Sequence, residues 1–73
     1  MSQLEFESKV SSIVRQLLND DEQAGFFGTT GTLFAACSET TARSIFHRLS
    51  LEFGVGKVQI NGPIQGEFCY DFV

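Results

Sequence analysis

The residues that most invite a chemical role lie in the glycine-rich segment Gly25–Thr32, which reads GFFGTTGT. A phosphate-binding loop follows a strand, ends in Lys and then Ser or Thr, and opens a helix, so that backbone amides surround the anion. This segment lacks that ending and precedes a predicted strand. We therefore expect a turn whose glycines permit positive φ. Binding of an anion or small molecule, with Arg48 or Lys57 as the cation, is the alternative function.

His47 is the single histidine of the chain and the natural candidate for a general base. On a helical wheel of 3.6 residues per turn it lies about 145° from the centre of the apolar stripe of its predicted helix. We expect it to be exposed beside Arg43 and Arg48. No nucleophile and acid stand at a spacing that would complete a catalytic triad, and the sequence predicts a protein that is not an enzyme.

The remaining candidate ligands do not predict a metal or a cofactor. Cys37, Cys69 and His47 lack the short spacings typical of zinc sites. The acidic run Asp20–Glu22 lacks the alternating acids and the glycine of a calcium loop. Because nothing marks the chain as secreted, we expect a cytoplasmic location and two free, buried or half-buried thiols.

Charge and hydropathy exclude two further classes of partner. Five Lys and Arg stand against nine Asp and Glu, a net charge of −4, and the basic residues are scattered. Nucleic-acid binding requires a basic patch, so we expect no direct nucleic-acid contact. No apolar run approaches the roughly 18 residues that span a bilayer, so we expect no membrane span.

Apolar periodicity predicts two helices. The first runs from about Gln3 to Leu18, with Ser2 at its N-cap. The second starts behind Ser38 or Thr40 and stops at Gly54. Their apolar positions recur at helical spacing: Phe6, Val10, Ile13, Val14, Leu17 and Leu18 in the first, and Ala42, Ile45, Phe46, Leu49 and Phe53 in the second.

Three strands complete the predicted elements. Residues 32–37 resemble a strand, although two Ala weaken the pattern. Residues 57–61 and 67–72 alternate apolar and polar side chains, with a turn near Gly62 and Pro63. We expect a single α+β domain, residues 1–73, in the order α-β-α-β-β. Two helices would cover one face of a three-stranded sheet in which the last strand is central and antiparallel to both neighbours.

The predicted fold leaves one face of the sheet without a covering layer. If the helices cover Phe68, Tyr70 and Phe72, we expect an uncovered face made of Leu33, Ala35, Cys37, Gln59, Glu67 and Cys69. The outer side of the second helix, with Arg43, His47 and Leu51, is a second candidate contact surface, because Leu51 lies opposite the apolar stripe.

The small size of the chain favours a partner. A chain of 8.1 kDa buries about 7,000 Å² on folding. That burial contributes about 105 kcal/mol, and ordering 73 residues costs about 110 kcal/mol. The two terms nearly cancel, so self-association would help, and we expect a homodimer. The sequence thus predicts a small non-enzymatic protein-binding or adaptor domain.

The stretch GTTGTLFAACSETTARSIFHRLSLEFGVGKV, followed by GEFCYDFV, resembles small uncharacterised proteins of tailed phages that infect marine cyanobacteria. The resemblance covers residues 26–73. This group has no assigned activity, so no residue inherits a role from it. The resemblance implies a small phage protein that acts in the cytoplasm of the infected cell by binding and modulating a host protein.

Overall fold

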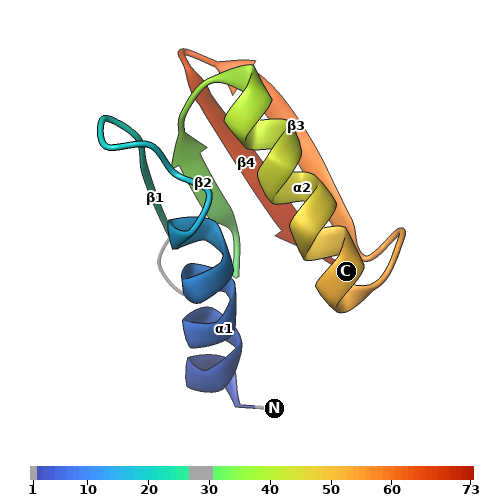
Figure 1. Ribbon diagram of the computed structural model, residues 1–73. Coiled ribbons are helices and arrows are strands. Elements are labelled where there is room, and N and C mark those ends of the chain that lie inside the picture. Colours follow the sequence, from blue (N-terminus) through green and yellow to red (C-terminus); the bar gives the residue numbers. More distant parts are fainter. Residues whose placement is uncertain (1, 27–30) are drawn as a thin grey trace.

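The computed structural model describes residues 2–26 and 31–73 (Figure 1). These residues form two helices and four strands. In chain order the elements are α1 (Gln3–Arg15), β1 (Gln23–Phe26), β2 (Leu33–Ala36), α2 (Glu39–Phe53), β3 (Val58–Ile64) and β4 (Glu67–Phe72). The predicted α+β class is confirmed, with one more strand than expected.

The described strands form one sheet in the order β1-β2-β4-β3, and every neighbouring pair is antiparallel. The predicted central position of the last strand is confirmed, because β4 lies between β2 and β3. The strand missed from the sequence is β1. Its four residues include Gln23, Ala24 and Gly25, which have low strand propensity, and they show no apolar alternation.

The order of elements has a simple relation to a common topology. If the chain is followed from β2 through β4 and then continued at α1, the elements run β-α-β-β-α-β. This is the cyclic order of the ferredoxin-like motif, with the start of the chain moved to a helix. The likeness concerns the fold alone, since one fold can carry many functions.

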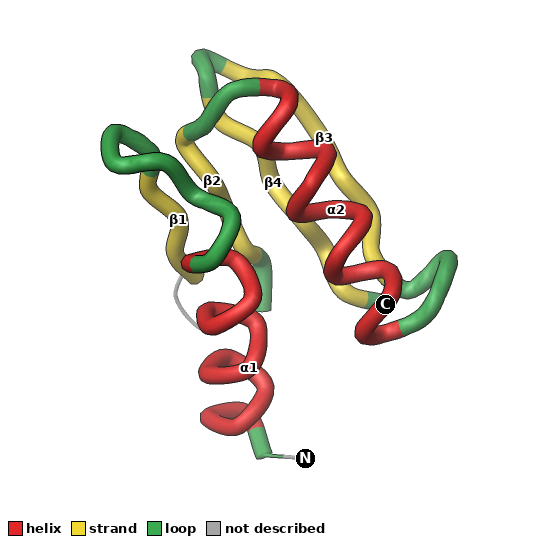
Figure 2. Tube along the Cα trace, viewed as in Figure 1, coloured by secondary structure: helices red, strands yellow, loops and turns green. Residues whose placement is uncertain are grey.

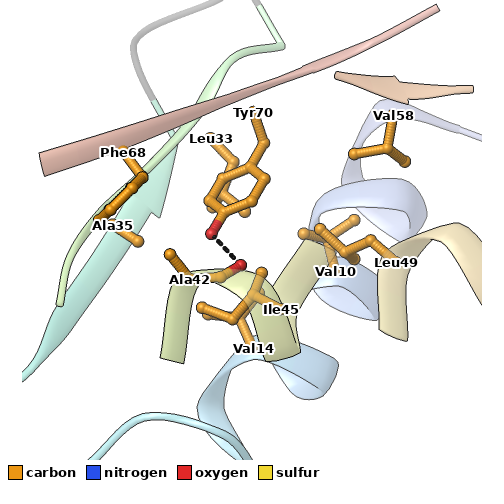
Figure 3. Close-up of a cluster of buried hydrophobic side chains, with 10 residues drawn as sticks. All are labelled: Val10, Val14, Leu33, Ala35, Ala42, Ile45, Leu49, Val58, Phe68 and Tyr70. Atoms are coloured by element: carbon orange, nitrogen blue, oxygen red, sulfur yellow. Dashed lines mark hydrogen bonds between the residues drawn. The ribbon is translucent and has the colours of Figure 1, made fainter. Parts of the chain in front are cut away.

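Both helices lie on the same face of the sheet, and Figure 2 shows α2 running along β3 and β4. A single buried cluster joins the two layers (Figure 3), and its members are Val10, Val14, Leu33, Ala35, Ala42, Ile45, Leu49, Val58, Phe68 and Tyr70. The Tyr70 hydroxyl donates a hydrogen bond of 2.8 Å to the Ala42 carbonyl oxygen. Burial raises the pKa of Tyr70 far above its usual range, with a smaller contribution from Cys37.

Four phenylalanines extend this core where the two helices meet the sheet. Phe6 of α1 meets Phe72 of β4 edge-on with 4.9 Å between ring centroids, and lies 5.4 Å from Phe53 and 6.2 Å from Phe26. Each such pair adds about 0.5–1.5 kcal/mol beyond the area it buries. This cluster accounts for Phe26, which periodicity alone does not place.

The N-terminal ends of both helices agree with the predicted caps. The Ser2 and Ser38 hydroxyl oxygens accept hydrogen bonds from the backbone N–H groups three residues later, as N-caps do. The first helix ends at Arg15, three residues earlier than predicted. Gly54 follows α2 as predicted, with a φ of +111°, a value that favours glycine. Its ψ of 144° is extended, so the stop is not a left-handed helical cap.

The connection between β3 and β4 differs from the prediction. Gln65 and Gly66 form a two-residue turn with φ values of +54° and +80°, and Ile64 pairs with Glu67. The predicted turn residue Gly62 instead lies inside β3, where the pairing register shifts. A Cβ atom there would lie 2.7 Å from the Glu67 carbonyl oxygen. Gly62 is therefore required by the irregular strand and not by the turn.

Candidate functional site

The sheet face that points away from the helices is the main candidate surface, and we name it the open face. Residues paired across antiparallel strands point to the same side of a sheet, so the register defines its rows. The first row holds Gln23, Ala36, Glu67 and Ile64, and the second holds Gly25, Phe34, Cys69 and Asn61. The third, beside them, holds Thr32, Asp71 and Gln59.

Phe34 is the aromatic centre of the described open face. It pairs with Gly25 on β1 and with Cys69 on β4. A Cβ atom at Gly25 would lie 3.7 Å from the tip of the Phe34 ring, so the ring extends across this glycine. Phe34 and Cys69 are half-buried, Ala36 is exposed, and Ile64 is 66% exposed. These side chains make a small apolar patch.

The polar part of the open face is acidic. Asp71 accepts hydrogen bonds from the Thr32 hydroxyl at 3.1 Å and from the Asn61 amide at 3.4 Å, so its carboxylate is held in place. Glu67 is exposed in the row that also holds Ile64. Within the described strand positions of the open face these two acids are the charged residues. Lys57 lies just before β3, with its side chain beside Gly54.

The structure corrects half of the predicted open face. Gln59, Glu67 and Cys69 lie on it as predicted. Leu33 and Ala35 were also assigned to it, but they are 1% and 0% exposed and pair with Tyr70 and Phe68 under the helices. The reason is that side chains along a strand point to alternate faces of the sheet. A shift of one residue moves a whole strand to the opposite face, and both faces of β2 are apolar, so alternation does not distinguish them.

Cys37 was assigned to the wrong side for the same reason. It follows the alternation of β2 and packs half-buried against the core under the helices. Burial raises the pKa of its thiol, and the nearby Glu22 carboxylate raises it further. This arrangement favours an unreactive thiol at neutral pH. Both cysteines are free, as predicted.

The apolar open-face side chains that sequence reasoning missed are Phe34, Ala36 and Ile64. Phe34 carried a partial signal, because it alternates with Leu33 and one of the two had to point outward. Ile64 carried none, because its position depends on the irregular register after Asn61.

The outer side of α2 is a second surface, and its exposure agrees with the prediction. Arg43, His47 and Leu51 are exposed, and Leu51 is 68% exposed. Arg43 forms an ion pair of 3.2 Å with Glu39 one turn earlier. This pair borders a cleft of about 340 Å³ between α2 and the β3–β4 hairpin, whose apolar lining consists of Phe46, Ile60, Pro63 and Phe68.

Glu22, in the acidic run before β1, has a structural role. Its carboxylate accepts hydrogen bonds from the backbone N–H of Ser38 at 2.8 Å, the backbone N–H of Asn19 at 2.9 Å and the Thr41 hydroxyl at 3.0 Å. The backbone bonds from Ser38 and Asn19 are the main reason that the pKa of Glu22 lies below its usual value. The side chain therefore ties the α1–β1 loop to the N-terminus of α2.

The glycine-rich segment is only partly within the described residues. Gly25 belongs to β1 and not to a loop, and Gly31 has a φ of +77°, as expected of a turn glycine. Residues 27–30, including Phe27, lie outside the described residues.

Comparisons with family models, with curated proteins and with solved structures found no match. Among residues 2–26 and 31–73, no three His, Cys, Asp or Glu side chains gather in a way that could hold a metal ion. Neither helix in this part of the chain is long and apolar enough to cross a membrane.

Proposed function

We propose that this chain is a small, non-enzymatic protein-binding domain whose contact surface is the open face. The observation that carries the proposal is the half-buried Phe34 ring at the centre of the face, with Ala36, Cys69 and Ile64 around it and polar side chains at the border. Aromatic anchors within a polar rim are the usual anatomy of protein–protein contacts.

Two features support binding over catalysis. His47 is exposed on the outer side of α2, which does not favour a general base in an enclosed site. Tyr70, whose pKa is strongly raised, is fully buried, and its hydroxyl donates its hydrogen bond to the Ala42 carbonyl oxygen. Both residues thus have simple structural accounts. The resemblance to cyanophage proteins favours a cytoplasmic host protein as the partner.

The predicted homodimer stays a prediction, and the edge of β1 is where the described structure favours it. β1 has one neighbour in the sheet, and residues Gln23–Phe26 contain no Pro and no charge. The opposite edge strand, β3, carries Pro63 and an irregular register, which discourage pairing. Sedimentation equilibrium at micromolar concentration would detect the dimer, and a monomer of 8.1 kDa would contradict it.

Site-specific photo-crosslinking tests the proposed function. The change Phe34→benzoylphenylalanine should give a discrete adduct with another protein in extracts of the host cell, and Ser12→benzoylphenylalanine on α1 should not. The adduct should weaken with Ile64→Ser and persist with Leu51→Ser, because Ile64 lies on the open face and Leu51 on the outer side of α2. Equal crosslinking from positions 34 and 12 would refute the proposal.

A further inference from the structure

The charges and dimensions of the open face restrict what kind of protein surface can cover it. We infer that its occupant is a basic amphipathic helix, which lays an apolar stripe on Phe34 and Ile64 and places Lys or Arg near Glu67 and Asp71. This inference rests on the proposed function and specifies the chemistry of the partner.

Size is the first argument. Four strands about 4.8 Å apart and three side-chain rows about 6.8 Å apart give a face of roughly 20 by 20 Å, or about 400 Å². A stable interface takes about 800 Å² from each partner. The open face alone is therefore too small for a stable dimer. It fits a single helix of about 13 residues, which is about 20 Å long and about 10 Å wide.

Charge is the second argument. Glu67 and Asp71, the charged side chains at the described strand positions of this face, are both acidic. A second copy docked face to face would bring like charges together, and a nucleic acid would bring phosphates to the same acids. A partner with Lys or Arg meets opposite charge instead, and complementary charges of this kind give specificity and a fast association rate.

The spacing of the two acids sharpens the inference. Glu67 and Asp71 are four residues apart on β4, which is about 14 Å along the strand. A helix that runs along β4 rises by that distance in about nine residues, but residues about nine apart lie on opposite sides of a helix. Residues about eleven apart lie on the same side, about 16 Å from each other, and flexible Lys or Arg side chains cover the difference. The partner helix should therefore carry two basic residues about eleven positions apart, with apolar residues between them on the same side.

A pair of designed 14-residue peptides provides the probe. Both have a leucine stripe on one side. One peptide carries two Lys about eleven residues apart on that same side, and the other carries Glu at those positions. In titrations of ¹⁵N-labelled protein, the Lys peptide should shift the backbone amide signals of Gly25, Phe34 and Cys69. The Glu peptide should bind about tenfold more weakly, because two attractive pairs become repulsive. Affinity of the Lys peptide should fall as salt increases.

Matched variants distinguish the effect of this surface on peptide affinity from the effect of the overall negative charge. Glu67→Gln should weaken the Lys peptide about twofold to fivefold, while Glu5→Gln, an exposed acid on α1, should leave its affinity unchanged. Ile64→Ser should weaken both peptides. Because the Ile64 side chain is 66% exposed, this change leaves the core intact.

Several results would overturn the inference. They are equal binding of both peptides, no binding of either, an equal effect of Glu5→Gln and Glu67→Gln, or shifts confined to another surface. If the amide signal of Phe34 shifts with the concentration of the protein alone, the occupant is a second copy of the chain. If a single-stranded oligoribonucleotide causes the same shifts, the occupant is a nucleic acid. If an adduct forms at position 34 but neither peptide binds, the proposed function stands and the basic helix is wrong.

Discussion

Removal of the Tyr70 hydroxyl tests the hydrogen bond that connects the sheet to α2. Tyr70 is 0% exposed and donates a hydrogen bond of 2.8 Å to the Ala42 carbonyl oxygen. The change Tyr70→Phe keeps the ring and removes the donor. The Ala42 carbonyl still accepts the N–H four residues later in the helix, so no buried group loses its last partner. We expect a loss of about 1 kcal/mol in the free energy of unfolding.

Urea unfolding followed by circular dichroism measures this loss. For a domain of this length, about 1 kcal/mol corresponds to a fall in Tm of roughly 4–8 °C, and the slope m should not change. Ser12→Ala, which removes an exposed hydroxyl from α1, is the matched control and should stay within about 0.5 kcal/mol. A change below about 0.3 kcal/mol for Tyr70→Phe would refute a net contribution from this bond.

Alkaline pH gives an independent readout of the same side chain. Burial raises the pKa of Tyr70 in the folded protein, whereas in the unfolded chain it titrates near pH 10. Above about pH 10 the unfolded chain therefore loses a proton that the folded protein keeps, and stability falls. Tyr70→Phe lacks this loss, so the difference in the free energy of unfolding between the two proteins should narrow above that pH. As the single tyrosine, Tyr70 can be followed by absorbance, and ionisation near pH 10 in the folded protein would contradict its burial.

Two further perturbations follow from specific contacts. Gly62→Ala should cost about 3 kcal/mol or more, since positive φ and a Cβ atom 2.7 Å from the Glu67 carbonyl both oppose it. Gly66→Ala, with φ +80° and open space around it, should cost only about 1–2 kcal/mol; equal costs in urea unfolding would contradict this. Glu22→Gln should lower stability at neutral pH. The pKa of Glu22 is lowered, so the difference from the native protein should disappear as pH falls from about 4.5 through that lowered pKa; a constant difference would contradict it.

The sequence predicted the elements whose signals are local. The helices and their caps follow from apolar spacing and from Ser2 and Ser38, and β4 follows from strict alternation. The predictions failed where long-range pairing decides the outcome. β1 becomes a strand because β2 provides a neighbour, and Gly62 enters β3 because the chain turns three residues later, at Gln65 and Gly66.

The orientation of β2 is the failure that matters for function. Leu33 and Ala35 point inward because they pair with Tyr70 and Phe68, whose inward direction is unambiguous. This choice places the small Ala35 opposite the large Phe68 and leaves Phe34 on the open face. A half-buried aromatic ring gains less from folding than a fully buried one. Departures of this kind from the most stable pattern are expected at functional surfaces, so the residue that the sequence could not place is also the centre of the proposed contact.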